Sequence, residues 1–211
     1  MRNNIIEALR RKKDFAPRVV FDIGGNVGQS AVEFAGAWPQ ARIYSFEPIP
    51  RTFALLQEAT TEFPNVVTSR IAFGARSGVA TMLARDTSPV NRIISRPTEE
   101  PTIEAQVSTI DAFCASENIP ALEFVKIDTE GHDLKVLVGG ANMLREQRIE
   151  FVQVECALSP DNRQHVSLDA FSGFLFPLGY RLFGLFDLEH RLGKTRLRGA
   201  GFGNAVFVKE P

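Results

Sequence analysis

One stretch near the N-terminus constrains the fold more than any other part of the chain. The apolar run Val19–Ile23 contains Asp22 and is followed by glycines at 24, 25 and 28, after which a helix-compatible segment begins. A buried strand that turns through glycines into a helix lets the backbone approach a ligand closely. The stretch therefore predicts a strand–turn–helix unit of a parallel sheet, with a ligand at the turn; a tight turn without a ligand is the alternative.

A second acid follows at the spacing that nucleotide-binding folds use. Residues 43–46 form another short apolar strand, and Glu47 ends it about 20 residues after the first turn. A carboxylate can accept hydrogen bonds from both hydroxyls of a ribose. We therefore interpret Glu47 as a ribose ligand rather than a surface acid.

Strand-like and helix-like segments alternate along the chain. We expect strands at 19–23, 43–46, 65–71, 78–83, 105–108, 123–127, 150–155, 180–186 and 204–208, and helices at 29–37, 51–59, 110–116, 132–144 and 168–178. This order predicts an α/β fold whose mostly parallel sheet has helices on both faces and ends in an antiparallel C-terminal hairpin. We expect residues 1–18 to form an N-terminal helical extension and 19–211 a single domain.

Composition narrows the class of protein. A net charge of −1 and an isoelectric point near 6.3 provide no general attraction for nucleic acid. No apolar run reaches the roughly 18 residues that span a bilayer, and the N-terminus lacks the apolar core of a secretory signal. Cys114 and Cys156 lie far apart and form no CxxC motif, which indicates reduced thiols and a cytoplasmic protein. The oligomeric state stays open, a homodimer included.

The first turn differs from the dinucleotide fingerprint. The row reads D-x-G-G-N-x-G in place of G-x-G-x-x-G, and the carboxylate of Asp22 would repel a pyrophosphate. Asp22 suits a ligand that has positive charge and no phosphate, and S-adenosylmethionine carries an ammonium and a sulfonium. We expect Asp22 to favour its methionyl end, directly or through water, and the backbone from Gly24 to Gly28 to pack along it.

Several segments together resemble the FkbM family of S-adenosylmethionine-dependent methyltransferases. The matching segments are FDIGGNVGQ at 21–29, FEP at 46–48, AFG at 72–74 with Gly78, STIDAF at 108–113, FVKIDTEGHD at 124–133 and the strand at 151–155. The KIDxEG element is fairly specific, whereas many methyltransferases share the glycine turn. The family's usual form has Ala at Gly25, Leu at Ile110 and Glu at Asp133. The first two differences are mild, and the third leaves the role of Asp133 open.

The resemblance implies a class I methyltransferase fold and O-methylation, commonly of a sugar or natural-product hydroxyl, with a glycan or small molecule as acceptor. It assigns Asp22, Gly24 and Gly28 to the methionine side of S-adenosylmethionine, Glu47 to the ribose and Ala72 to the adenine edge. Asn26 and Pro48 lie inside the matching motifs and join this cofactor-binding set.

The strand expected at 123–127 is followed by ionisable groups that can serve methyl transfer. Methyl transfer needs an oxygen nucleophile beside the methyl carbon and a destination for its proton. Lys126 and Asp128 share a face of the strand, because side chains alternate. Glu130 and His132 follow on the turn. We take these four as catalytic candidates, with Asp128 or His132 as general base and Lys126 holding Asp128 ionised or positioning the hydroxyl.

A metal ion is the competing interpretation. Asp128, Glu130 and Glu155 could gather Mg²⁺ or Mn²⁺, which would bind the acceptor hydroxyl and lower its pKa. A purely structural role is also open, in which Glu130 and Asp133 stabilise the N-terminus of the following helix. His165 either reaches the site from its loop or lies at the surface.

The acceptor pocket is not defined by the sequence, and residues 85–101, 155–166 and 191–203 are candidates for it. Two rival functions are an NAD-dependent oxidoreductase and a non-catalytic S-adenosylmethionine-binding module. The first lacks the phosphate fingerprint and an obvious proton relay, and the set of Lys126, Asp128 and Glu130 argues against the second.

Overall fold

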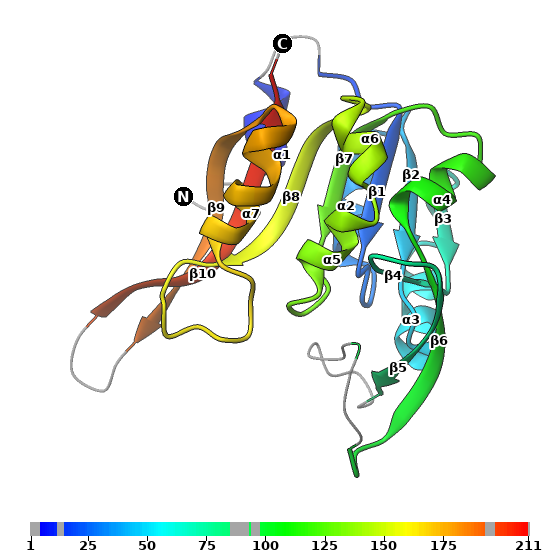
Figure 1. Cartoon of the computed structure of the whole chain (residues 1–211). Helices are drawn as coiled ribbons and strands as arrows, with labels where there is room; N and C mark the ends of the chain where they lie inside the picture. The colour runs from blue at the N-terminus through cyan, green and yellow to red at the C-terminus, as the bar shows by residue number, and fades with distance from the viewer. Residues whose placement is uncertain (1–4, 12–14, 85–92, 94–97, 193–196, 211) are drawn as a thin grey trace.

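The computed structural model describes residues 5–11, 15–84, 93, 98–192 and 197–210. At its centre is a seven-stranded sheet in the order β3-β2-β1-β7-β8-β10-β9 (Figure 1). The strands are β1 (Val19–Ile23), β2 (Arg42–Phe46), β3 (Val66–Ser69), β7 (Leu122–Ile127), β8 (Ile149–Ala157), β9 (Tyr180–Leu192) and β10 (Leu197–Lys209). The first five in space are parallel, and β10 runs antiparallel to both β8 and β9. The predicted α/β fold with an antiparallel C-terminal hairpin is confirmed.

Helices cover both faces of the sheet. They are α1 (Ile5–Arg10), α2 (Gln29–Ala37), α3 (Pro50–Ala59), α4 (Ile110–Ser116), α5 (Asp133–Val138), α6 (Ala141–Arg145) and α7 (Leu168–Leu175), with a 3-10 turn at Phe176–Leu178. Alternate residues of a strand feed two separate cores, as the pleat requires. Phe21 packs with residues of α4 to α7, whereas Val20 and Phe124 pack with residues of α1 and α2.

A second, three-stranded sheet was not expected from the sequence. It consists of β4 (Ala72–Phe73), β6 (Thr102–Ser108) and β5 (Gly78–Leu83), in the order β4-β6-β5. The strand expected at 65–71 ends at Ser69, and the chain passes from there into β4. Ala72 and Met82 of this sheet pack with Ile49, at the entrance to α3, in a small separate core.

The single helix expected at 132–144 is instead two helices, α5 and α6, which Gly139 and Gly140 separate. A Cβ at Gly139 would lie 2.1 Å from the carbonyl oxygen of Gly74, so the chain breaks where two backbones meet. Asp111 then accepts hydrogen bonds from the amides of Asn142 and Met143 in the first turn of α6. Close approach and a side-chain cap therefore override the helical periodicity.

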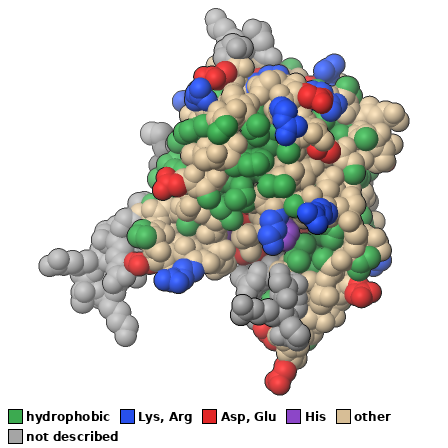
Figure 2. Space-filling view, in the orientation of Figure 1, with side chains coloured by type: hydrophobic (Ala, Val, Ile, Leu, Met, Phe, Trp, Pro, Cys, Tyr) green, Lys and Arg blue, Asp and Glu red, His purple; other side chains and the backbone are tan. Residues whose placement is uncertain are grey.

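Hydrophobic side chains gather on the upper part of the face shown in Figure 2, and charged side chains surround them. Both cysteines are free and buried. Among the described residues, no helix combines the length and apolar character that crossing a membrane requires. Of the candidates for the acceptor pocket, residues 85–92 and 94–97 of the segment 85–101 and residues 193–196 of the segment 191–203 lie outside the described residues.

Candidate active site

A cavity of about 290 Å³ opens at the carboxyl ends of β1, β2 and β7, beside Glu155 of β8. The carboxyl ends of parallel strands are where ligands bind in open α/β sheets. Of the predicted site residues, those that line the cavity are Gly24, Asn26, Glu47, Pro48, Ala72, Asp128, Glu130, His132 and Glu155. Asp22, Gly28 and Lys126 are not among the residues that line it.

The first glycine turn is held between two neighbouring strands. Gly24 has φ of +86°, and a Cβ there would lie 1.9 Å from the carbonyl oxygen of Asp128. The amides of Gly24 and Gly25 both donate to the carbonyl oxygen of Phe46, at 3.0 and 2.9 Å. The turn needs glycine at position 24 because β7 approaches so closely. Gly28, with φ of +98°, is the N-cap of α2 and faces Leu56 and other side chains of α3.

Glu47 is a buried acid whose carboxylate is already oriented. Its Oε1 accepts a hydrogen bond from the amide of Ile49 at 2.9 Å, and its Oε2 accepts one from the amide of Asn26 at 3.2 Å. Each oxygen keeps a lone pair for another donor. Burial raises the pKa of Glu47 to about 7, and the two amides oppose this shift only in part.

Beneath the cavity, a row of polar side chains crosses the sheet. Ser45, Asp22, Lys126 and Gln153 are consecutive partners in the register of β2, β1, β7 and β8, and all four are buried. Ser45 Oγ donates to Asp22 Oδ2 at 2.7 Å, and Lys126 Nζ lies 3.4 Å from Asp22 Oδ1. Asp22 has no exposed surface, so its carboxylate acts on the cavity through its neighbours.

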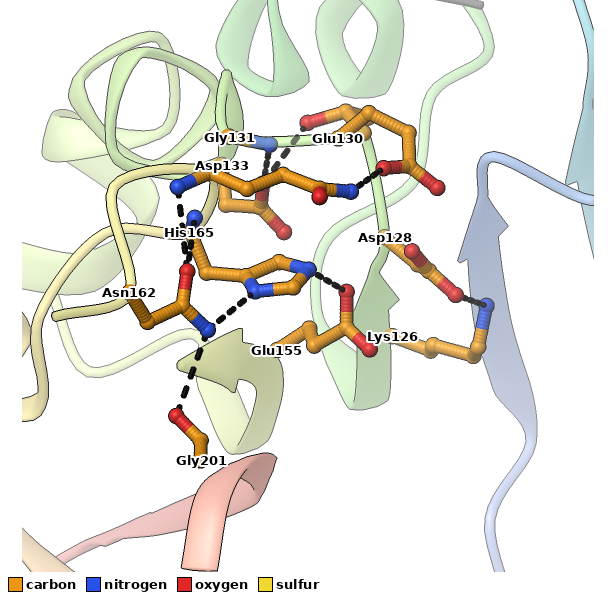
Figure 3. A network of polar contacts seen from close by, with 11 residues as sticks. Lys126, Asp128, Glu130, Gly131, Asp133, Glu155, Asn162, His165 and Gly201 are labelled. Carbon is orange, nitrogen blue, oxygen red and sulfur yellow. Dashed lines mark hydrogen bonds and ion pairs between the residues drawn. The ribbon is translucent and has the colours of Figure 1, made fainter. Parts of the chain in front are cut away.

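Lys126 joins this row to the cavity. Its Nζ lies 3.3 Å from Asp128 Oδ2, as Figure 3 shows. Burial works against an ammonium, yet Asp128 and Asp22 raise the pKa of Lys126 above its ordinary value. Lys126 is therefore a fixed cation that positions Asp128, and it has no lone pair with which to accept a proton.

Glu155 lies beside Asp128 on the adjacent strand, because Ile127 and Val154 are the last register partners of β7 and β8; β8 itself continues to Ala157. Its Oε2 is 2.8 Å from His165 Nε2, in the loop that precedes α7 (Figure 3). This contact raises the pKa of His165. The sequence left the position of His165 open, and the structure places it against a carboxylate of the cavity.

Asn162 fixes which ring nitrogen of His165 carries the proton. Its Oδ1 accepts hydrogen bonds from the amides of Gln164 and His165, at 3.0 and 3.2 Å, so its Nδ2 must be the end that faces Gly201 and the ring. Nδ2 donates to the carbonyl oxygen of Gly201 at 3.2 Å and lies 2.9 Å from His165 Nδ1. His165 Nδ1 is thus an acceptor, and Nε2–H donates to Glu155.

The turn after β7 is fastened to the same loop. Gln164 Nε2 donates to Glu130 Oε2 at 2.9 Å, and burial raises the pKa of Glu130. Glu130 and Gly131 both have positive φ, of 55° and 86°, and a Cβ at Gly131 would lie 2.4 Å from the carbonyl oxygen of Gln164. No spacing in the sequence points to Asn162 or Gln164, because their contacts depend on how the loop folds back over β7.

His132 and Asp133 follow this turn with different surroundings. His132 lines the cavity, and burial together with Lys135 lowers its pKa to about 4, so the ring is neutral at physiological pH. Asp133 is buried and accepts hydrogen bonds from Thr129 Oγ1 and the Gly131 amide, both at 3.2 Å. Its Oδ1 has no hydrogen-bond partner among the described residues. Asp133 thus holds the turn together.

The three carboxylates expected to bind a metal do not fit one. They line the same cavity, but each is directed at its own partner: Asp128 at Lys126, Glu130 at Gln164 and Glu155 at His165. Within the described part of the chain, no three His, Cys, Asp or Glu side chains are grouped so that they could hold a metal ion. The arrangement therefore favours the alternative without Mg²⁺ or Mn²⁺.

Comparison with known proteins places the chain in a family. The model of the methyltransferase FkbM domain matches residues 22–182. The chain belongs to the FkbM methyltransferase family. It is 30% identical over 147 residues to the hexuronic acid methyltransferase AglP of Haloferax volcanii, a match that covers 67% of this chain and 58% of that protein. It is 22% identical over 156 residues to the 2-O-methyltransferase NoeI of Sinorhizobium fredii, covering 64% and 62%. The match thus spans less than two thirds of either relative.

Solved structures share the FkbM chain's fold. The magnesium protoporphyrin IX methyltransferase ChlM from Synechocystis, solved with bound S-adenosylmethionine, has a TM-score of 0.57 at 11% identity and covers 98% of this chain and 76% of its own. A precorrin-6y C5,15-methyltransferase from Geobacter metallireducens has a TM-score of 0.52 at 13% identity, with coverages of 98% and 86%. The fold is that of class I methyltransferases, as the sequence implied.

Proposed function

We propose that this FkbM protein transfers a methyl group from S-adenosylmethionine to a hydroxyl of a saccharide, glycolipid or related metabolite. The observation that carries the proposal is the order of groups along the cavity. Glu47, Gly24 and Asp128 directly follow the neighbouring strands β2, β1 and β7, and Glu155 lies on the adjacent β8, next to the last residue of β8 that pairs with β7. Across the sheet, the acid that we propose for the ribose is therefore followed by the glycine turn that we propose for the methionyl chain. Next to that turn come the two carboxylates that we propose for the reacting hydroxyl.

The residues present fit the proposed cofactor. Glu47 is the buried acid with lone pairs left for ribose hydroxyls, and Gly24 leaves the space that a Cβ would fill. Ala72 and Phe73 offer an apolar edge for an adenine, and Gly24 and Asn26 offer a turn for the methionyl part. S-adenosylmethionine supplies, when bound, an electrophilic methyl group on a positively charged sulfur.

The chain's own contribution to the chemistry is to orient the acceptor and take its proton. Asp128 lines the cavity and is held by Lys126, while His132 lines it as a neutral ring with an available lone pair. Both line the cavity, so both are candidates for a general base that acts on a bound hydroxyl. We propose Asp128 for this role, with His132 as the alternative.

The acceptor class is supported by the relatives. One is named for hexuronic acid and the other for 2-O-methylation, so both names fit methylation of an oxygen-rich acceptor. For this chain, we propose a saccharide hydroxyl, as found in a glycan or glycosylated natural product.

The first test of the proposal is binding of the cofactor. Isothermal titration calorimetry should detect binding of S-adenosylmethionine and no binding of NAD. Binding of NAD alone would instead favour the NAD-dependent oxidoreductase. Transfer of labelled methyl from S-adenosylmethionine to a panel of glycosides then tests the reaction. Asp128→Ala should abolish transfer while S-adenosylhomocysteine, which lacks the sulfonium charge, still binds as it does to the unmodified protein. Cofactor binding without transfer to any glycoside would favour the non-catalytic module.

A further inference from the structure

We infer that Asp128 and Glu155 make this cavity selective for positive charge on the sulfur of its ligand, so that the protein binds S-adenosylmethionine more tightly than S-adenosylhomocysteine. The inference rests on the proposed function, since it concerns the same cavity and cofactor. It adds a specificity that neither the family nor the relatives' names describe.

The first step is the charge of the cavity wall. Four acids line the cavity, and none of the described lining residues is Lys or Arg. The nearest described ammonium in contact with this set is Lys126, below the wall, which lies between Asp22 and Asp128. One ammonium against two carboxylates leaves negative charge on the side that Asp128 presents to the cavity.

The second step concerns Glu155. Its partner, His165, donates through Nε2–H while Nδ1 accepts from Asn162, and this second contact opposes the extra proton that Glu155 favours on the ring. With the ring neutral, the pair of Glu155 and His165 keeps the negative charge of the carboxylate. Phe202 stacks on the ring, with centroids 4.7 Å apart, and keeps it in this orientation.

The third step separates these two acids from the others. Glu47 stands at the opposite end of the four strand ends, and burial raises its pKa to about 7. Glu130 faces Gln164, and burial raises its pKa as well. Asp128 and Glu155 are neighbours on β7 and β8, and their side chains are 39% and 21% exposed. They are therefore the acids that a cation in the cavity would meet.

The two ligands differ only in the group that these acids would detect. S-adenosylmethionine has a sulfonium, whereas S-adenosylhomocysteine has a neutral thioether after the methyl group has left. Charge interactions are stronger in a partly enclosed cavity than in water. Loss of the positive charge would then weaken binding and favour release of the product after each transfer.

The experiment compares the dissociation constants of the two ligands by calorimetry at pH 8. We expect S-adenosylmethionine to bind about tenfold more tightly in the unmodified protein, as an order of magnitude for one opposite charge in a partly enclosed cavity. Glu155→Gln and Asp128→Asn should each reduce the ratio of the two dissociation constants several-fold, because each should weaken only the binding of S-adenosylmethionine. Glu155→Gln keeps an oxygen for His165 Nε2–H, so it preserves the packing of the loop.

Glu47→Gln is the matched control, because it removes a carboxylate from the ribose end of the same cavity. It should weaken the binding of both ligands by the same factor and leave the ratio of their dissociation constants unchanged. Equal or tighter binding of S-adenosylhomocysteine by the unmodified protein would overturn the inference while sparing the proposed function. The inference would also be overturned if the ratio of the two dissociation constants stayed unchanged in both Glu155→Gln and Asp128→Asn. Failure of both ligands to bind would remove the proposed function itself.

Discussion

The Cβ position of Gly25 points at the hydroxyl of Ser45: an added methyl group would lie 2.2 Å from Ser45 Oγ. That hydroxyl is buried and donates to Asp22 Oδ2 at 2.7 Å. A side chain at position 25 could be accommodated only if Ser45 moved, and Asp22 would then lose its donor. Glycine at this position and serine on β2 therefore form a matched pair in this chain.

Gly25→Ala should consequently destabilise the protein, although the family's usual alanine made the difference look mild. Overpacking of this kind costs about 1–3 kcal/mol. Ser45→Ala should cost about 1–3 kcal/mol by leaving Asp22 without its donor, and the double variant should cost less than the sum of the two. Urea denaturation of all four proteins measures this coupling.

Gly36→Ala is the control for that series, because a Cβ at Gly36 meets nothing within 4 Å and the residue lies in α2. It should leave stability unchanged or raise it by up to about 1 kcal/mol. Additive losses in the Gly25 and Ser45 cycle would show that the two residues do not interact.

Glu47 should make cofactor binding depend on pH. Burial disfavours the charge and raises its pKa to about 7, so the carboxylate that we propose as the acceptor for ribose hydroxyls forms only as the pH rises through that value. The affinity for S-adenosylmethionine should therefore increase about tenfold between pH 6 and pH 8, following the ionised fraction. Calorimetric titrations across this range measure it.

The same shift has the opposite effect on the stability of the free protein. The pKa of Glu47 is higher in the folded state than the ordinary 4.5, so its contribution to stability is greatest below 4.5 and is lost as the pH rises through about 7. In Glu47→Gln, both the rise in affinity and this loss of stability should be smaller. A variant with the unmodified protein's pH dependence of binding would rule Glu47 out as its source.

Much of the framework of the site could be read from the sequence, because it depends on strand periodicity. Lys126 on β7 and Asp128 just after it lie on the same face and form an ion pair, as the alternation of side chains predicts. Glu47 likewise ends β2 at the cavity. Local rules suffice where one strand and its following turn determine the direction of a side chain.

The parts that could not be predicted depend on contacts between distant segments. The break at Gly139 follows from its approach to Gly74, and the burial of Asp22 follows from its register with Ser45 and Lys126. The contact of His165 with Glu155 requires the loop before α7 to fold back over the strand ends. Such contacts join residues that no spacing rule connects.

Asp133 should make the stability of the protein depend on pH, and replacing its carboxyl group with an amide in Asp133→Asn should remove that dependence. Burial raises its pKa from the ordinary 3.8 to about 7, so ionisation in the folded state costs free energy that grows as the pH rises from 3.8 to about 7. Asp133→Asn can still accept hydrogen bonds from Thr129 and Gly131. Its melting temperature relative to the unmodified protein should increase between pH 5 and pH 8.

Asp111→Asn is a suitable comparison for Asp133→Asn, since Asp111 also accepts two amide hydrogen bonds, at the start of α6. The difference in melting temperature between Asp111→Asn and the unmodified protein should change less with pH than the corresponding difference for Asp133→Asn. If the two variants showed the same pH dependence, burial of Asp133 would not be its cause.

Chelation tests the interpretation of the carboxylates directly. Because Asp128, Glu130 and Glu155 are each directed at a separate protein partner, methyl transfer should keep its rate after exhaustive treatment with EDTA. A methyltransferase known to require Mg²⁺, assayed alongside, confirms that the treatment works. Loss of activity that Mg²⁺ or Mn²⁺ restores would instead establish the metal-assisted reaction.

Asn162 should control the charge of His165, and through it the charge beside Glu155. Its amide donates to Nδ1 and so disfavours a second proton on the ring. In Asn162→Asp, a carboxylate oxygen would face Nδ1 and favour the imidazolium, which would offset the charge of Glu155. Nitrogen-15 NMR of the three histidines should show a raised His165 pKa, and the preference for S-adenosylmethionine should fall with it. Gln164→Ala, which removes the donor to Glu130, should change the His165 pKa less. A His165 ring that titrates identically in Asn162→Asp would mean that the amide does not set its protonation state.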